Sequence, residues 1–362
     1  MTVSKDQVLA ALARIPAPDR TPLPQTGTLS DIVAKDGKVF FSLTVDAAAV
    51  PQWESVRKQA EDAVRALPGV QSVMVALTAE RRGGGGGGAP PRPAQGQARA
   101  QPGAAQGQST GLPGVESIIA VASGKGGVGK STTAVNLALG LRDLGLQVGV
   151  LDADIYGPSM PKLLAIRERP QTVGGTRLKP ILRYGLTVMS IGFLIEEETP
   201  MIWRGPMVMS AITQMLREVE WGTLDVMVVD MPPGTGDAHL TLTQAVPIDG
   251  AVIVTTPQEI ALIDAKKGLR MFDKVGARIL GIVENMGTFV CPDCGAEHAI
   301  FAEGGGRATA ERYDVPFLGT IPLHRDVTPT GDEGVPIVRA RPDSPIAERF
   351  REIARRVVAA VG

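Results

Sequence analysis

The stretch SGKGGVGKST, from Ser123 to Thr132, combines residue types that can hold a phosphate. It matches G-x-x-x-x-G-K-[ST] between a strand-like apolar run and a helical run, which is the context that this motif requires. Glycines let backbone N–H groups turn toward a phosphate, and the helix N-terminus adds its positive dipole end. We expect Lys130 to reach the β- and γ-phosphates and the Ser131 hydroxyl to coordinate Mg²⁺. The expected nucleotide-binding residues are Gly124, Lys125, Gly126, Gly127, Val128, Gly129, Lys130, Ser131 and Thr132.

Three aspartates stand at the ends of later apolar runs. The stretch VLDADIYGPSMP places Asp152 and Asp154 near the carboxyl end of a strand, where ligands bind in open α/β sheets. The stretch VMVVDMPPGTGD places Asp230 after four apolar residues, which is the Walker B pattern. Such a carboxylate holds Mg²⁺ through water. Packing alone does not explain a buried strand that ends in Asp with Pro-Pro-Gly close behind, so we expect these residues to complete a nucleotide site.

The stretch VCPDCG holds the only two cysteines of the chain, Cys291 and Cys294. A redox pair prefers a helix N-terminus that lowers a thiol pKa, whereas Pro292 and Gly295 indicate a turn. A structural zinc site needs four ligands, and His298 offers a third without a fourth nearby. A buried, unreactive pair is disfavoured by the acidic residues of the same turn. The remaining arrangement is two chains whose pairs meet on a two-fold axis, and four thiolates suit either zinc or a [4Fe–4S] cluster.

Short apolar runs separated by helical segments must position these residues. Seven runs are nearly continuous in apolar residues, as parallel strands covered on both faces are: SIIAVAS, QVGVLDAD, LTVMSIG, DVMVVDM, GAVIVTT, ILGIVENM and PFLGTIP. We therefore predict an α/β fold over residues 115–362, a doubly wound and mostly parallel sheet. A small α+β domain over residues 1–80 precedes it.

The N-terminal 80 residues have an α-β-β-α-β pattern. Asp36-Gly37 is a hairpin signal between two strand-like runs, and Pro51 begins a helix with apolar residues at three-and-four spacing. With LPGV before its last strand, the pattern resembles the SufT-like domain of iron–sulfur assembly proteins, which implies a docking module; a plain structural appendage is the alternative. Residues 81–114 are rich in Gly, Ala, Pro and Gln, so they cannot bury enough apolar surface to fold, and we expect a disordered linker.

Composition limits the function classes. The net charge of −1 gives no general attraction to nucleic acid or anionic lipid. No apolar run reaches a membrane-spanning length, so we expect a cytoplasmic protein with no nucleic-acid and no membrane partner. Thiols stay reduced in that compartment, which favours metal binding or redox chemistry for the cysteine pair over a structural disulfide.

A second lysine in the phosphate loop, Lys125, resembles that of the deviant Walker A family, which includes partition ATPases, septum-site ATPases and the nitrogenase iron protein. The resemblance implies that Lys125 crosses a homodimer interface to the partner's nucleotide; a solvated loop lysine is the alternative. It also implies that Asp154 orients the attacking water and that Asp152 lies close to the magnesium shell of Ser131 and Asp230. No N-K-x-D element for guanine is present. By position in this family Asn285, in VENMG, pairs with adenine, so ATP is favoured over GTP.

Five stretches together are similar to those of the Mrp/ApbC family of iron–sulfur cluster carriers: GKGGVGKST, LDADIYGPSMP, DMPPGTGD, ENMGTFVCPDCG and PFLGTIPL. The resemblance spans about residues 116 to 340. It implies an ATP hydrolase that holds a labile [4Fe–4S] cluster between two protomers through Cys291 and Cys294. It also implies cluster donors and recipient apoproteins as partners. The extra N-terminal cysteine motif of some eukaryotic relatives is absent, so only the bridging cluster is expected.

Two rival functions share parts of this pattern. A ParA/MinD-like partition or septum-positioning ATPase has the same loop and dimer but binds DNA or membrane. The C-terminal stretch SPIAERFREIARRVVAAV has an apolar stripe of Ile346, Phe350, Ile353 and Val357 that could lie on lipid, although packing on the sheet is favoured. A scaffold that binds ATP without hydrolysing it is the second rival.

Overall fold

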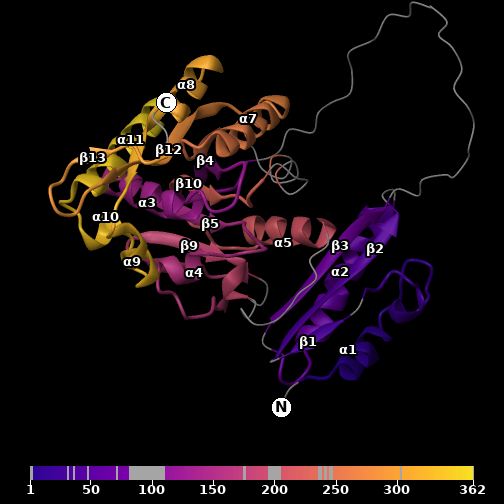
Figure 1. The fold of residues 1–362 in the computed structure, drawn as a ribbon. Helices are drawn as coiled ribbons and strands as arrows, with labels where there is room; N and C mark the ends of the chain where they lie inside the picture. Colours follow the sequence, from indigo (N-terminus) through magenta and orange to yellow (C-terminus); the bar gives the residue numbers. More distant parts are fainter. Residues whose placement is uncertain are drawn as a thin grey trace, which may run out of the picture. The chain divides into compact units, whose positions relative to one another are not determined.

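The structure is a computed structural model that describes residues 3–361 apart from 31, 36, 47–48, 71, 81–110, 174–176, 195–204, 235–238, 240–242, 244–247 and 302–303. The chain divides into two compact units, Met1–Ser109 and Thr110–Gly362 (Figure 1). Residues 81–110 of the predicted linker lie outside the described residues.

The smaller unit has the predicted α-β-β-α-β order, with one short 3₁₀ turn added. A three-stranded sheet has the order β1-β2-β3, in which β1 pairs antiparallel and β3 parallel with β2. A capping box between Ser4 and Gln7 begins α1, and a proline in the first turn helps to begin α2. The elements are α1 (Lys5–Leu12), η1 (Leu23–Gln25), β1 (Val33–Lys35), β2 (Lys38–Asp46), α2 (Val50–Arg65) and β3 (Ser72–Glu80).

The core of this unit lies between α2 and the sheet. Residues at three-and-four spacing on α2 are buried, and alternate residues of β2 point at them, which is how these two periodicities meet across a core. The buried residues of α2 are Trp53, Val56, Ala60 and Val64, and those of the strands include Phe41, Leu43 and Val75.

The larger unit contains a mostly parallel sheet with the order β13-β12-β11-β4-β10-β5-β9-β8, and β14 pairs with β12. Among the described strands of this sheet, only β8 with β9 and β13 with β12 form antiparallel pairs. All seven apolar runs are strands of this sheet: β4 (Val115–Ala122), β5 (Val148–Asp152), β9 (Leu186–Ser190), β10 (Leu224–Asp230), β11 (Gly250–Thr255), β12 (Ile279–Val290) and β14 (Phe317–Leu323). The other two are β8 (Ile181–Arg183) and β13 (Glu297–His298). The predicted fold is confirmed.

Helices cover this sheet and fix its edge. α3 packs against β4, β5 and β10, and α11 packs against β14; the two helices also contact each other. α7 packs against β11 and β12, and α8 packs against β12 and β14. The helices are α3 (Lys130–Asp143), α4 (Met160–Leu163), α5 (Gly205–Arg217), α7 (Glu259–Lys274), α8 (Gly305–Arg312), α9 (Val327–Asp332), α10 (Ile337–Ala340) and α11 (Pro345–Val361). A 3₁₀ turn, η3 (Ile191–Phe193), and a small hairpin of β6 (Thr172–Val173) and β7 (Arg177–Leu178) complete the unit.

The apolar stripe of α11 faces inward. Its four predicted residues are at most 4% exposed, because α3 and β14 cover them: Ile346, Phe350, Ile353 and Val357. Among the described helices, none is long and apolar enough to cross a bilayer. The stripe therefore packs on the sheet, which is the favoured of the two predictions from the sequence.

Candidate functional site

The phosphate loop joins β4 to α3, in the context that the motif requires. It spans residues 123–129 and ends where α3 begins, at the helix N-terminus that stabilises an anion. Gly127 and Gly129 both have a φ of +81°, a left-handed backbone that favours glycine. A Cβ on Gly124 would lie 2.1 Å from the carbonyl carbon of Asp264 in α7, so a side chain cannot fit there. Gly124, Gly127 and Gly129 are thus explained by the conformation and the packing of the loop.

Asn285 of β12 packs against this loop. Its Nδ2 donates a hydrogen bond of 2.9 Å to the Val128 carbonyl oxygen. If residue 129 had a Cβ, that atom would lie only 2.2 Å from the same Nδ2, so Asn285 leaves room for glycine alone. The next residue, Met286, has a φ of +55°, a left-handed conformation that costs a residue with a side chain about 1–2 kcal/mol. The structure therefore gives Asn285 a role in holding the phosphate loop. Its contact with adenine stays a prediction.

Lys130 lies in a buried cluster with two of the predicted carboxylates. Its Nζ is 2.5 Å from Oδ1 of Asp230 and 3.6 Å from Oδ2 of Asp154, and 3.3 Å from the Ser131 hydroxyl oxygen. Burial raises the pKa of both carboxyl groups, and the ammonium of Lys130 opposes that rise. The structure thus brings four predicted site residues together, with one cation between two carboxylates.

Each of these carboxylates keeps one oxygen that lacks a donor. Oδ1 of Asp154 and Oδ2 of Asp230 are buried and have no hydrogen-bond partner among the described residues. Buried acceptors without a donor are rare in folded proteins. Water molecules around Mg²⁺ are donors, and Mg²⁺ usually binds through one or two carboxylates and its own waters. The residues present therefore fit hydrated Mg²⁺ beside a phosphate.

Asp152 has a different environment from the other two aspartates. Its Oδ2 accepts hydrogen bonds from the backbone N–H groups of Ser159 and Met160, both at 3.0 Å, and from the Ser190 hydroxyl at 2.9 Å. Its Oδ1 accepts from the N–H of Asp154 at 3.2 Å. Burial and the nearby Asp230 raise the pKa of Asp152 to about 7. Asp152 therefore shapes the loop that carries Asp154, and its place near the magnesium shell stays a prediction.

His239 belongs to the same buried region, and the sequence interpretation missed it. It is 1% exposed, and its Nε2 has no hydrogen-bond partner among the described residues. Its ring makes a hydrogen bond with the backbone of Pro232. Burial and the charge of Lys130 lower the pKa of His239 to about 4, so the ring is neutral. The only signal in the sequence is a histidine among apolar residues shortly after the Walker B loop.

Lys125 contrasts with Lys130 in its surroundings. Its side chain is exposed, and no carboxylate of the described residues pairs with it. Its backbone carbonyl accepts a hydrogen bond of 2.9 Å from the Ser123 hydroxyl, which fixes the backbone at this position. The side chain is therefore open to a second molecule. Its action in trans stays a prediction.

The cysteine pair sits in a turn after β12, as Pro292 and Gly295 predicted. β12 and β13 pair antiparallel beside it, and Gly295 has a φ of +74°. The N–H of Gly295 donates to the Cys291 carbonyl at 2.9 Å and closes the turn. Backbone N–H groups of Cys294 and Asp293 lower the pKa of the Cys291 thiol by hydrogen bonding. Cys291 is half-buried and Cys294 is exposed.

The described part of one chain gives these cysteines no further ligand. Within the described residues, no three His, Cys, Asp or Glu side chains are grouped so that they could hold a metal ion. His298 lies on β13 opposite Phe289 and is exposed. A complete zinc site within the described part of one chain is therefore not supported, and the pair remains half of a site.

Comparisons with known proteins show the family to which both parts of the chain are similar. Residues 114–358 match the family described as NUBPL iron-transfer P-loop NTPase, and residues 5–76 match an iron–sulfur cluster assembly protein family. An iron–sulfur cluster carrier protein of Synechocystis sp. is 42% identical over 368 residues, which cover 99% of this chain and 98% of that protein. A nucleotide-binding protein of Archaeoglobus fulgidus, solved in complex with ADP, has a TM-score of 0.57 at 38% identity and covers 66% of this chain and 92% of its own.

A more distant likeness concerns the fold alone. The cell division ATPase MinD of Pyrococcus furiosus has a TM-score of 0.51 at 22% identity, over 67% of this chain and 99% of its own. The predicted resemblance to iron–sulfur cluster carriers is confirmed by both family matches and by the Synechocystis relative. The chain therefore belongs to the family of NUBPL iron-transfer P-loop NTPases.

Proposed function

We propose that this chain is an ATP-hydrolysing iron–sulfur cluster carrier that holds a [4Fe–4S] cluster between two protomers and passes it to apoproteins. The observation that carries the proposal is the exposed turn with Cys291 and Cys294, in a chain of an iron-transfer family. The Synechocystis relative, which matches over nearly its whole length, is named a cluster carrier. The reduced thiols that such a site needs favour the cytoplasm.

The buried cluster around Lys130 supports ATP hydrolysis. A γ-phosphate competes with Asp230 for the Lys130 ammonium, because charge-assisted hydrogen bonds to either anion are strong. Ser131 and the released Asp230 would hold Mg²⁺, which supplies positive charge to the phosphates. Asp154, whose Oδ1 lacks a donor, orients the attacking water. The exposed Lys125 adds its charge to the partner's nucleotide, where negative charge develops in the transition state.

The turn around the cysteines supports a cluster shared by two chains. Four cysteine thiolates hold a [4Fe–4S] cluster, and each chain supplies two. Backbone N–H groups directed at Cys291 stabilise its thiolate, which is the form that binds iron. A two-fold axis that brings the two turns together completes the site with identical contributions from both protomers. A change in how the protomers pack around ATP then changes how openly the cluster is held.

A partition or septum-positioning ATPase is the weaker candidate. Its membrane form needs an apolar helix face at the surface, whereas the stripe of α11 is buried against α3 and β14. The likeness to MinD extends to the fold only. A scaffold that binds ATP without hydrolysis is separated from our proposal by measuring phosphate release.

Anaerobic reconstitution with iron and sulfide tests the cluster proposal. We expect a brown dimer with four irons per two chains, measured by iron analysis and by mass in solution. Cys291→Ser and Cys294→Ser should each lose the iron and still bind ADP, because the phosphate loop is built from other residues. Asp293→Asn, in the same turn, is the matched control and should keep the iron. Iron held by a monomer, or retained by both serine variants, would contradict the proposal.

The coupling between ATP hydrolysis and cluster transfer is tested with the same reconstituted protein. Lys125→Ala should reduce phosphate release at least tenfold, because a charge that meets the transition state is removed. Cluster transfer from this variant should no longer respond to ATP. Transfer that responds to ATP as in the unmodified protein would argue against the action of Lys125 in trans.

A further inference from the structure

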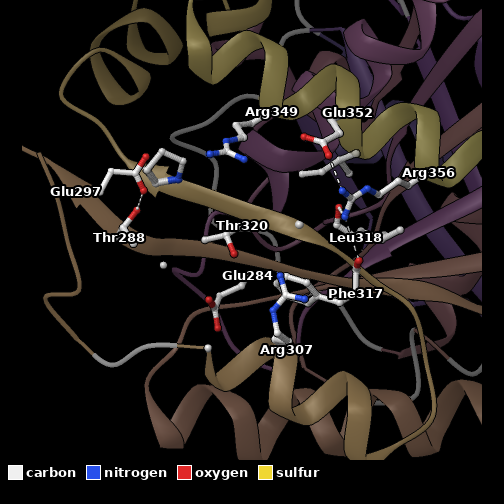
Figure 2. Close-up of a pocket in the computed structure, with 15 residues that line it drawn as sticks. Glu284, Thr288, Glu297, Arg307, Phe317, Leu318, Thr320, Arg349, Glu352 and Arg356 are labelled. Carbon is white, nitrogen blue, oxygen red and sulfur yellow. Dashed lines mark hydrogen bonds and ion pairs between the residues drawn. The ribbon is translucent and has the colours of Figure 1, made fainter. Parts of the chain in front are cut away.

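A cavity of about 450 Å³ opens at the edge of the large sheet, and its lining includes no residue of the buried cluster around Lys130. Figure 2 shows α11 on one side of β12 and β14 and α8 on the other, with side chains of both helices directed at the strands between them. The residues that matter for its chemistry are Glu284, Thr288, Glu297, Arg307, Arg349 and Arg356. The cavity is lined by charged, polar and apolar residues of two helices, α8 and α11, and three strands, β12, β13 and β14.

Two of its three guanidinium groups have no carboxylate partner among the described residues. Arg307 of α8 lies over the ring of Phe317, with 4.5 Å between its Cζ and the ring centroid. Arg349 of α11 is exposed and pairs with no described carboxylate. Arg356, by contrast, pairs with Glu352. Arg307 and Arg349 thus present two positive charges that the described part of the chain does not neutralise.

The strand at this edge is protected against the addition of another strand. β14 pairs only with β12 among the described strands. Arg356 donates to the carbonyl oxygens of Phe317 and Leu318, at 3.4 and 3.1 Å, and so covers one part of the edge. Pro322 has no N–H to offer a neighbouring strand. An occupant therefore enters with side chains, because the backbone edge is blocked.

The cavity reaches the base of the cysteine hairpin. The Thr288 hydroxyl donates to Oε2 of Glu297 at 3.0 Å, and this pair joins β12 to β13 next to the turn. Glu284, one residue before the loop anchor Asn285, accepts a hydrogen bond of 2.5 Å from the N–H of Gly306 at the start of α8. Glu297 therefore lies at the hairpin end of the cavity, whereas Glu284 lies beside the start of α8, the helix that carries Arg307.

We propose that this cavity is the docking site for acidic side chains of the protein that receives the cluster, a role that rests on the proposed function. Guanidinium groups bind carboxylates with two parallel hydrogen bonds, so Arg307 and Arg349 suit aspartate or glutamate on a partner. Glu297 repels such side chains from the hairpin end, which favours one orientation of the partner. The recipient is thereby held next to the two cysteines.

A peptide that alternates glutamate and serine, labelled with fluorescein, tests the docking site without cluster or ATP. Fluorescence anisotropy of the full chain should show binding that weakens with salt, and no binding of the matching lysine–serine peptide. The double variant Arg307→Gln with Arg349→Gln should bind at least tenfold more weakly. The control double variant, Arg312→Gln with Arg355→Gln, removes two exposed charges from the same helices outside the cavity and should change binding less than twofold.

Equal weakening in both double variants would overturn the proposal, because it would show a general charge effect. Binding of the lysine peptide, or no binding of the glutamate peptide, would do the same.

The role in transfer is measured separately, with a small acidic apo-ferredoxin as acceptor and the cluster-loaded chain as donor. The variant at Arg307 and Arg349 should keep its iron and should transfer at least tenfold more slowly at low acceptor concentration, with recovery at saturation. Unchanged transfer at low concentration would overturn the docking role. Failure of the wild-type chain to bind iron would instead refute the proposed function.

Discussion

Replacing the buried histidine beside the nucleotide cluster should make the protein more resistant to mild acid. His239 is 1% exposed, and burial together with Lys130 lowers its pKa to about 4. In the unfolded chain a histidine has a pKa of about 6.5. Between these values the unfolded chain binds a proton that the folded chain does not. The stability present above pH 6.5 is therefore lost as the pH falls toward 4.

The magnitude follows from the difference of roughly 2.5 pKa units. One unit corresponds to about 1.4 kcal/mol, so the full loss is about 3 kcal/mol, of which about 2 kcal/mol has occurred at pH 5. His239→Gln keeps a polar side chain that does not titrate. Asp152, with its pKa raised to about 7, contributes in the opposite direction: its stabilisation is lost as the pH rises through 7. Both proteins share Asp152, so its contribution cancels in their difference.

The assay is urea unfolding of the nucleotide-free chain at pH 7.5 and pH 5, followed by circular dichroism of the transition of the larger unit. The free energy of unfolding of His239→Gln relative to the wild type should rise by about 2 kcal/mol between these pH values. His298→Gln, on the exposed hairpin, is the matched control and should show no such change. An identical pH dependence of His239→Gln and the wild type would refute the reasoning.

Two further predictions concern the phosphate loop. Gly124→Ala should prevent tight ADP binding and lower the melting temperature, since its Cβ would overlap the backbone of Asp264; Gly126→Ala, where a Cβ meets no atom within 4 Å, should keep the melting temperature. Equal melting temperatures of the two variants would contradict this. Lys130→Met should destabilise the nucleotide-free chain by about 3–5 kcal/mol at pH 8, because the buried carboxylates lose their cation. Urea unfolding should show that part of this lost stability is recovered at pH 5.5, because a carboxyl group with a raised pKa takes up a proton there. The same loss of stability at both pH values would exclude this explanation.

The strands and the phosphate loop could be predicted because their signals are local. A parallel strand buried on both faces is a continuous apolar run, and the loop motif needs only its own glycines and lysine. The hydrogen bond between Asn285 and Val128 joins residues 157 positions apart, so no local pattern contains it. The hydrogen bond from Ser190 to Asp152 and the burial of His239 likewise depend on segments that the fold brings together. The same holds for the cavity, which five separate elements form.

The strand β12 has a mechanical consequence for the molecule. It touches the phosphate loop at Asn285 and leads to Cys291 six positions later along one continuous backbone. The segment is irregular, because the four steps from Asn285 to Phe289 run alongside only two steps of β14, and Met286 within it has a left-handed φ of +55°. A displacement of Asn285 would reach the cysteine turn through the few residues that include Met286, so the rigidity of this segment would set how closely the two regions move together.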